Sequence, residues 1–267
     1  MKNLEERKIS FIGGGIIAGV FIEQLIKSGF VFQSNILVSD IKQERLDELK
    51  NKYSVQVTQN NEDAVKFGDF IFIAVPPSQV KTVLSENCKM IRADQILISL
   101  AAAIPLWIFE SVLCKDVATV RVVPNTPSQI GKGANPYCLG KYLTEQQIND
   151  VEELLSVFGL AVKIDESQMN LATALSAVGP TYFFPAIKAM KDFAISKGMN
   201  EKEAVDIISQ TISGTADLVK ETGKDPDELK LMIGTRTIDE VAVKDIYTKA
   251  IEEALSKVNH ATQKLTE

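Results

Sequence analysis

The chain has 267 residues, of which 45% are hydrophobic and 24% are charged, and its net charge is −6. This composition is typical of a globular protein, and the length predicts two domains. The acidic balance argues against a nucleic-acid partner or an anionic membrane surface, and no apolar run is long enough to span a membrane.

Strands and helices alternate through the first part of the chain. Helical stretches separate the apolar runs, and the first helix extends from the glycines after residue 12 to about residue 28. This alternation predicts a doubly wound parallel sheet of the Rossmann type, an α/β fold, over residues 1–164. The predicted strands are residues 8–12, 36–40, 54–57, 69–75, 95–100 and 118–123.

From about residue 165 the pattern changes to helices alone. Helical periodicity covers residues 168–197, 201–221, 225–233 and 238–258. The first of these helices is apolar around much of its circumference and must therefore be buried. Because about a hundred residues of helix can hardly bury it alone, we predict an all-helical dimerisation domain over residues 165–267 that exchanges helices in a homodimer.

Histidine and cysteine are scarce. The only histidine, His260, lies near the C-terminus, which excludes a mechanism that needs a central histidine as acid or base. The cysteines Cys88, Cys114 and Cys138 are odd in number and form no Cys-x-x-Cys pair. We interpret them as reduced thiols of a cytoplasmic protein and predict no metal site. The charged residues 1–8 lead straight into a strand and do not resemble a signal peptide.

A glycine-rich turn joins the first predicted strand to the first predicted helix. It has the pattern Gly13-x-Gly15-x-x-Ala18. The first glycine permits a tight turn, the second lets the backbone approach a pyrophosphate, and the alanine allows the helix to pack closely on the strand. The N-terminus of the helix attracts the negative charge of such a ligand. In this strand–turn–helix context, the pattern predicts nucleotide binding.

Asp40 is the acidic residue that a nucleotide site of this kind requires further along the chain. It ends the second predicted strand, 25 residues after Gly15. Its carboxylate is placed to accept hydrogen bonds from the ribose hydroxyls and would repel a 2′-phosphate, which favours NAD over NADP. Lys42 and Arg45 lie close enough in sequence to weaken that preference. Alternatively, Asp40 is an ordinary cap of the helix that follows Lys42.

Three further strand ends are predicted to border the same cleft, because ligands of open α/β sheets bind beyond the carboxyl ends of the strands. Ala74, Val75 and Pro76 end one strand, and Ala101 follows the next. Asn125 lies in the sequence Pro-Asn-Thr-Pro after the last, where the two prolines stiffen the turn. Each of these segments is also compatible with an ordinary turn.

The second domain contains a Gly-Pro pair, Gly179 and Pro180, inside a predicted helix. Such a pair costs several kcal/mol in a helix unless the kink has a purpose. We therefore predict a site around Gly179 that includes Ser176 and Tyr182. A kink that serves helix packing alone is the other interpretation.

These segments together resemble the pyrroline-5-carboxylate reductases. The resemblance extends from about residue 9 to residue 241. It is most specific in Pro-Asn-Thr-Pro at residues 124–127, in Gly-Lys-Gly-Ala at residues 131–134, and in Gly-Pro with Tyr182. It implies a Rossmann domain followed by an intertwined helical dimerisation domain. It also implies the NAD(P)H-dependent last step of proline synthesis, with a small imino acid as substrate.

The chain departs from the family pattern at several positions. Ile16 and Ile17 replace Asn-Met after the glycines, and Pro76 with Pro77 replaces Lys-Pro. The family's substrate loop is of the type Ser-Pro-Gly-Gly-Thr-Thr, and its amides hold the substrate carboxylate. Here that loop is reduced to residues 233–238 and lacks Pro-Gly-Gly. The loop is therefore either rebuilt for a similar acid or no longer a pyrroline site.

The resemblance assigns candidate residues to each part of the site. Thr237 is the closest match to the family's hydroxyl that contacts the ring nitrogen, whereas Arg236 has no counterpart but can bind a carboxylate at two points. The predicted cofactor contacts are Gly13, Gly15, Ile16, Ile17, Asp40, Ala74, Val75, Pro76, Ala101 and Asn125. The predicted substrate contacts are Asn125, Gly179, Gly234, Thr235, Arg236 and Thr237.

The activity predicted from these residues is the reduction of an imine. A protonated C=N bond is already electrophilic, so positioning and one hydroxyl hydrogen bond suffice without histidine. We predict Thr237 or Ser176 near the imine nitrogen and Tyr182 as a further proton relay. The predicted cofactor is NAD(P)H, with NADH slightly favoured by Asp40.

Other functions remain open at this point. The chain is either a reductase of another small imine or carbonyl acid, or a non-catalytic nucleotide-binding regulator whose substrate loop has decayed. The β-hydroxyacid dehydrogenases are less compatible, because residues 171–185 lack the lysine that they need. Deazaflavin-dependent NADP reductases share the first domain but lack a long helical second domain.

Overall fold

The computed structural model describes residues 6–266 and divides the chain into two compact units. The first unit ends at Val178, beyond the predicted boundary at residue 164, and also takes in the chain from Ala254 onward. The second unit extends from Gly179 to Glu253. No strand occurs after Lys163 among the described residues, as the sequence predicts.

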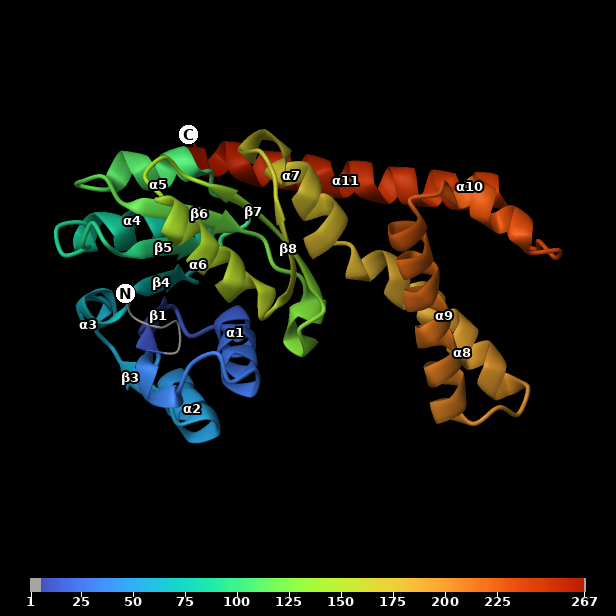
Figure 1. The fold of residues 1–267 in the computed structure, drawn as a ribbon, viewed down its shortest axis with the longest axis horizontal. Helices are drawn as coiled ribbons and strands as arrows, with labels where there is room; N and C mark the ends of the chain where they lie inside the picture. Colours follow the sequence, from blue (N-terminus) through green and yellow to red (C-terminus); the bar gives the residue numbers. More distant parts are fainter. Residues whose placement is uncertain (1–5, 267) are drawn as a thin grey trace. The chain divides into compact units, whose positions relative to one another are not determined.

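The first unit contains an eight-stranded sheet with the order β3-β2-β1-β4-β5-β6-β7-β8 (Figure 1). All six predicted strands form and pair in parallel, from β1 to β6. The strands are β1 Ile9–Ile12, β2 Ile36–Ser39, β3 Gln56–Thr58, β4 Phe70–Ile73, β5 Ile96–Ser99, β6 Ala118–Val122, β7 Gly133–Leu139 and β8 Gly159–Lys163.

Two further strands, which the sequence did not predict, extend the parallel sheet. Strand β7 pairs antiparallel with β6, and β8 pairs parallel with β7. Between β6 and β7 the chain forms only a short 3-10 helix, Thr126–Ile130. A connection of this length reverses the chain, whereas a parallel pair needs a longer crossover. The turn that contains Asn125 is therefore the point at which the parallel part of the sheet ends.

Helices cover both faces of this sheet. The buried core on one face includes side chains of α1, α2 and α6, and the core on the other face includes side chains of α3, α4 and α5. Burial on both faces explains why the strands of the parallel part are apolar at almost every position. The helices are α1 Ile16–Lys27, α2 Gln43–Tyr53, α3 Asn61–Phe67, α4 Pro77–Asn87, α5 Leu106–Val112 and α6 Glu145–Ser156, with short 3-10 turns at Gln33–Asn35 and Glu166–Gln168.

Two of the cysteines are not the reduced thiols that the sequence predicts. Cys88, at the end of α4, and Cys114, between α5 and β6, form a disulfide. They are 26 residues apart in sequence, but the fold brings their Cα atoms within 5.4 Å. Cys138 is free and buried on β7, and burial raises the pKa of its thiol to about 12.

The long helix predicted for residues 168–197 is interrupted in the structure. It begins as α7, Met169–Ala172, continues as a π-helical turn, Thr173–Ala177, and restarts as α8, Pro180–Ser196. Pro180 lies at the first position of α8, where its missing N–H costs nothing. The interruption therefore coincides with the Gly-Pro pair.

The second unit is entirely helical among its described residues. The segment predicted as a helix over residues 225–233 forms only one α-helical turn followed by a 3-10 turn. The elements after α8 are α9 Glu201–Thr222, α10 Pro226–Leu229, the 3-10 turn Lys230–Met232 and α11 Glu240–Thr266, which ends in the first unit.

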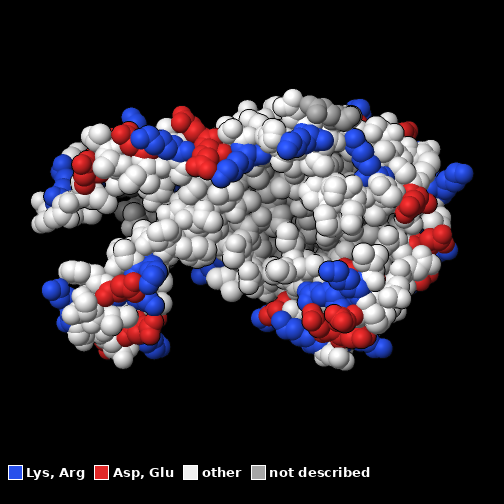
Figure 2. All heavy atoms as spheres, turned by 180° about the vertical axis from the view of Figure 1, so that it is seen from behind, with Lys and Arg blue, Asp and Glu red and all other residues white. Residues whose placement is uncertain are grey.

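Helix α8 has no buried residue in the single chain. Its large apolar side chains include Phe184 and Phe193, which are 55% and 65% exposed. Charged side chains of both signs lie close together on the face seen in Figure 2, as expected where lysines pair with carboxylates four residues away on a helix. No helix of residues 6–266 is long and apolar enough to cross a membrane.

Candidate functional site

The glycine-rich turn lies against the end of strand β4. Gly13 has φ +100°, and its amide donates to the carbonyl oxygen of Ser39 at 2.8 Å. A Cβ atom on Gly13 would lie 2.7 Å from the carbonyl carbon and oxygen of Ala74 and 2.9 Å from the amide nitrogen of Val75. Only glycine fits there, because its backbone adopts the left-handed region and nearly touches another strand.

Gly15 is the N-cap of α1, and the space beside it is open. A Cβ atom on Gly15 would meet no protein atom within 4 Å. No side chain caps this end of the helix, and its first turn has no acidic residue. The first two residues of α1, Ile16 and Ile17, are 83% and 47% exposed. The turn therefore offers free backbone amides at the positive end of a helix, which suits an anionic phosphate group.

Asp40 is held beside this turn by backbone amides. Its Oδ2 atom accepts a hydrogen bond from the Gly14 amide at 2.7 Å, and its Oδ1 atom accepts one from the Lys42 amide at 2.9 Å. Arg45 lies on the same turn, where its Nε donates to the Gly14 carbonyl at 2.5 Å and its Nη1 pairs with Glu48 at 2.7 Å. The Asp40 carboxylate therefore stabilises the conformation of the neighbouring backbone, and it also lines a cleft.

That cleft measures about 420 Å³ and contains six of the predicted cofactor residues. Asn61 and Gln79 complete its polar lining, and Asn61 accepts a hydrogen bond from the Ser39 hydroxyl at 2.8 Å. The predicted residues in the cleft are Gly13, Gly15, Asp40, Ala74, Val75 and Pro76. The other residues of the lining are Ser39, Ile41, Lys42, Arg45 and Val83.

A second cleft, of about 300 Å³, lies on the other side of the N-terminus of α1. The Pro-Asn-Thr-Pro turn forms one wall of it. Ile16 and Ile17 form another wall, and Ala177 of the π-helical turn also lines it. The structure thus brings Asn125, Ile16 and Ile17 together at this second cleft, apart from the other predicted cofactor residues.

Asn125 has a structural contact of its own. Its backbone is extended, with φ −123° and ψ 169°, and its Oδ1 atom accepts a hydrogen bond from the Ala134 amide at 3.0 Å. This bond ties the turn to the start of β7. The Asn125 side chain therefore stabilises the turn that forms one wall of the second cleft.

Ser176 lies in the π-helical turn next to the second cleft. Its hydroxyl is buried and has no hydrogen-bond partner among residues 6–266. A buried hydroxyl without a partner is costly, and π-helical turns are frequent at functional sites. The hydroxyl is thus available to a bound molecule.

Ala101 does not line either cleft. It is 5% exposed, and its amide donates to the Ser99 hydroxyl at 3.2 Å. The segment from Ala101 to Pro105 joins β5 to α5, and its carbonyl at Ala102 accepts a hydrogen bond from Arg121. The sequence alone suggested no role for Arg121, although a single charged residue inside an apolar strand is a visible signal.

The other predicted residues lie in the second unit. Tyr182 packs edge-on against Tyr247 with ring centroids 6.4 Å apart, and burial raises the pKa of its phenol, so the group stays protonated. Gly234, Thr235, Arg236 and Thr237 form an exposed segment between Met232 and α11. This segment is closed at its base by an ion pair of 2.6 Å between Lys230 and Glu240.

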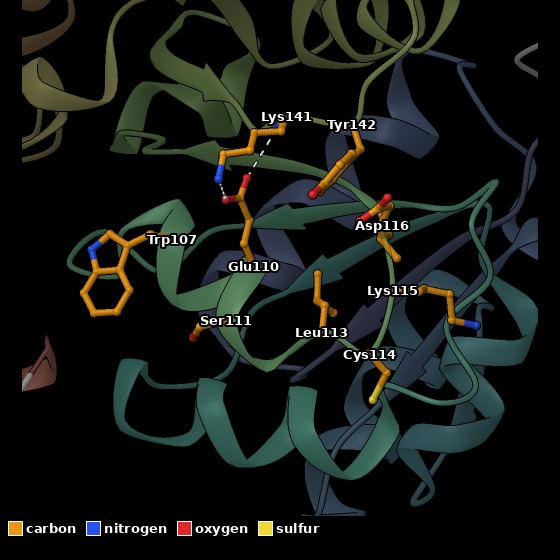
Figure 3. Close-up of a pocket in the computed structure, with 10 residues that line it drawn as sticks. Trp107, Glu110, Ser111, Leu113, Cys114, Lys115, Asp116, Lys141 and Tyr142 are labelled. Atoms are coloured by element: carbon orange, nitrogen blue, oxygen red, sulfur yellow. Dashed lines mark hydrogen bonds and ion pairs between the residues drawn. The ribbon is translucent and has the colours of Figure 1, made fainter.

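A third cleft, of about 530 Å³, lies at the opposite, amino-terminal edge of the parallel strands (Figure 3). Its charged groups neutralise one another. Glu110 pairs with Lys141 at 2.8 Å and raises the pKa of that lysine, and a hydrogen bond to Asp116 raises the pKa of Tyr142. Because ligands of this fold bind at the carboxyl edge, we do not place the reaction here.

Comparison with known proteins agrees with this arrangement. Residues 8–103 match the family model described as NADP oxidoreductase, coenzyme F420-dependent, and residues 166–265 match the one described as pyrroline-5-carboxylate reductase dimerisation. The chain is 33% identical to the pyrroline-5-carboxylate reductase of Methanosarcina acetivorans over 94% of its own length and 96% of that protein. It is 30% identical to the Escherichia coli enzyme of the same name, over 98% and 99% of the two chains.

Solved structures show the same fold along the whole chain. A pyrroline-5-carboxylate reductase from Coxiella burnetii matches with a TM-score of 0.81 and 28% identity, covering 97% of this chain and 99% of that one. A Plasmodium falciparum pyrroline carboxylate reductase with NADP bound matches with a TM-score of 0.84 at 23% identity, covering 97% and 100%. The chain belongs to the pyrroline-5-carboxylate reductase family.

Proposed function

We propose that the protein catalyses the NAD(P)H-dependent reduction of 1-pyrroline-5-carboxylate to L-proline, the last step of proline synthesis. The observation that carries this function is the match, over nearly the full length of both chains, to enzymes of that name. The cleft at the carboxyl edge of the sheet supports it, because its glycine turn and carboxylate suit a dinucleotide.

The residues of the first unit fit a dinucleotide. The cradle at Gly13, where a Cβ atom would collide with Ala74, and the open space at Gly15 leave room for the pyrophosphate. Asp40 would hold the adenosine ribose, while Ile16, Ile17 and Asn125, which line the second cleft, would border the nicotinamide half. A reduced nicotinamide supplies the hydride that an imine carbon accepts.

Asp40 supports a preference for NADH over NADPH. Its carboxylate is fixed by two backbone amides, so it cannot easily turn away from a 2′-phosphate. Of the two cations that line the cleft, Lys42 and Arg45, the second is paired with Glu48. The negative charge at the ribose position is therefore only partly balanced.

On the substrate side, hydroxyl groups take the place of the missing histidine. The unpaired hydroxyl of Ser176 and the exposed hydroxyl of Thr237 are the candidates to hydrogen-bond the imine nitrogen. Arg236 and the backbone of Gly234 and Thr235 are the candidates for the carboxylate. Gly179 and Asn125 would shape the wall, and the protonated phenol of Tyr182 is a further proton relay.

The function is tested by measuring NADH and NADPH oxidation by the purified protein with 1-pyrroline-5-carboxylate, together with the proline formed. We expect one proline per cofactor oxidised. Oxidation with other small imines or carbonyl acids only would favour a different substrate. Cofactor binding without turnover of any of them would favour a regulator with a decayed loop.

The substrate loop is tested separately with Thr237→Ala and Thr237→Ser. We expect Thr237→Ala to lower kcat at least tenfold and to leave the Kd of NADH unchanged, because the hydroxyl contacts only the substrate. Thr237→Ser keeps the hydroxyl and should retain most of the turnover. Equal turnover in all three proteins would remove Thr237 from the mechanism.

We also propose a homodimer in the cytoplasm. The match of residues 166–265 to the dimerisation model and the exposed apolar side chains of α8 support the dimer. The NAD(P)H-dependent activity favours a cytoplasmic location. The Cys88–Cys114 disulfide is unusual for that compartment, where thiols are kept reduced, and its state in the purified protein is directly measurable.

A further inference from the structure

Arg121 is a charged residue at the centre of the sheet of the first unit. It lies in β6 between β5 and β7, opposite Ser99 on one side and Cys138 on the other, and it is 1% exposed. Burial lowers its pKa. A charge in such a place is costly unless hydrogen bonds and an opposite charge compensate it. Its position therefore calls for an explanation beyond packing.

The guanidinium group joins two segments that lie far apart in sequence. Its Nη2 donates to the carbonyl oxygen of Ala102 and, at 3.2 Å, to Oδ1 of Asn170. Its Nη1 pairs with Oε1 of Glu166 at 3.4 Å. The same Glu166 oxygen accepts the Leu106 amide at 2.5 Å. The segment from Ala102 to Leu106 is thus held at both ends, once by Arg121 directly and once through its carboxylate partner.

Asn170 extends this network to the end of the chain. It belongs to α7, and its Nδ2 donates to Oδ1 of Asn259 at 2.9 Å and to the Thr262 hydroxyl at 3.3 Å. Helix α7 continues directly into the π-helical turn that contains Ser176. Arg121 therefore fixes the start of that turn as well as the loop after β5.

Both segments matter for the reaction proposed above. The loop after β5 starts at the carboxyl edge of the sheet, where the cofactor would lie, and the π-helical turn includes the unpaired hydroxyl of Ser176. Arg121 divides its partners between its two terminal nitrogens: Nη2 donates to Ala102 and Asn170, and Nη1 pairs with Glu166. A planar guanidinium holds these donors in a fixed fork, which a lysine ammonium cannot do. The geometry points to Arg121 as a positioning residue that sets the distance between the cofactor loop and the substrate turn. This role rests on the proposed function, because it acts through those two segments.

The test compares Arg121→Lys with a matched control, Arg7→Lys. Arg7 also forms an ion pair that is partly buried, with Asp150 at 2.5 Å, but it precedes β1 at the amino-terminal edge of the sheet. Both variants keep the positive charge and lose the fork. For each protein, kcat and KM for 1-pyrroline-5-carboxylate are measured per folded molecule, and hydrogen exchange is followed over residues 101–107 and 170–177.

We expect Arg121→Lys to lower kcat/KM at least tenfold, mainly through kcat, and to speed exchange at least tenfold in both segments. Arg7→Lys should lower stability without changing either quantity. If Arg121→Lys does not fold, Asn170→Ala takes its place in the comparison with Arg7→Lys. Asn170 is neutral and only partly buried, and its substitution removes one partner of Arg121. It should raise exchange over residues 170–177 and lower kcat/KM to a smaller degree.

The role would be overturned if Arg121→Lys lost stability but kept the kcat, the KM and the exchange rates of the unaltered protein. Unchanged behaviour of a folded Asn170→Ala would overturn it equally. A third outcome is also distinguishable: Arg121→Lys exchanges faster in both segments, but the unaltered protein never reduces the imine. That result would contradict the proposed function and would still support Arg121 as the residue that holds the two segments.

Discussion

Gly13 and Gly15 lie two residues apart in one turn, but the structure constrains them for different reasons. Gly13 is required by the protein itself, since a Cβ atom would collide with the backbone of Ala74. Nothing in the protein lies near the corresponding position on Gly15. A requirement for glycine at that second position can come only from a bound molecule.

A Gly15→Ala variant therefore reports on the ligand. We expect its free energy of unfolding to fall by less than about 1 kcal/mol, the usual cost of a poorer N-cap. The Kd of NADH should rise at least tenfold, because the methyl group occupies the place of the pyrophosphate. Gly13→Ala is the contrasting variant, which should lose about 1 to 3 kcal/mol through backbone strain. If Gly15→Ala bound NADH normally, the pyrophosphate would not lie at this turn.

At Asp40 too, one substitution can distinguish a role in the local backbone structure from a role in cofactor recognition. Asp40→Asn removes the negative charge but keeps one oxygen able to accept the Gly14 amide. We expect the ratio of kcat/KM for NADH to that for NADPH to fall at least tenfold, because repulsion of the 2′-phosphate is relieved. Steady-state kinetics with both cofactors measures this ratio. An unchanged ratio would mean that Asp40 only supports the turn.

At the scale of elements, apolar runs were enough to predict the parallel part of the sheet. Six strands form where their runs predicted them, and all but the edge strand β3 are buried at every residue. Strand β7 was missed because its sequence includes Gly133, Asn135 and Pro136, residues that are rare inside strands. Strand β8 was missed because it is largely exposed and has a glycine and a lysine at its ends.

Part of the site was predictable for the same reason. The glycine turn, Asp40 and Asn125 follow strands, and the topology of a parallel sheet brings strand ends together. The Arg121 network and the Cys88–Cys114 pair depend on contacts between distant segments, which spacing along the chain does not reveal. The exposed segment from Gly234 to Thr237 has no internal contact that could have predicted its shape.

The disulfide joins the end of α4 to the segment between α5 and β6. Counting the free thiols of the protein tests directly whether the bond is present. We expect one free thiol per chain after denaturation without reductant and three after reduction. Before denaturation Cys138 should not react, since burial raises the pKa of its thiol to about 12. Reduction should lower the free energy of unfolding by about 3 kcal/mol, as expected for a loop of this length. Three thiols without reductant would contradict the bond.

At the scale of the whole molecule, the exposed apolar side chains of α8 support the homodimer proposed above. A helix of this composition is not stable in water with its aromatic residues exposed. The match of residues 166–265 to a dimerisation model gives the same expectation. The assembly is therefore expected to be built from dimers.

Sedimentation or light scattering should give at least twice the chain mass of 29.3 kDa. Phe193→Glu should shift the protein toward monomer, because Phe193 is 65% exposed on α8. Phe32→Glu is the matched control, since Phe32 is equally exposed, at 66%, but lies in the first unit. A monomeric protein, or equal effects of the two substitutions, would argue against a dimer formed through α8.

The central claim is that hydride passes from a nicotinamide to the carbon of a cyclic imine, and isotope transfer tests it most directly. The protein is supplied with 1-pyrroline-5-carboxylate and NADH carrying deuterium at the transferred position, prepared separately in each stereochemical form. With one of the two forms, each proline formed should carry one deuterium, on the ring carbon that was doubly bonded to nitrogen. Proline without deuterium from either form would contradict hydride transfer from the nicotinamide to the imine carbon. Binding of NADH without formation of any proline would contradict the proposed activity.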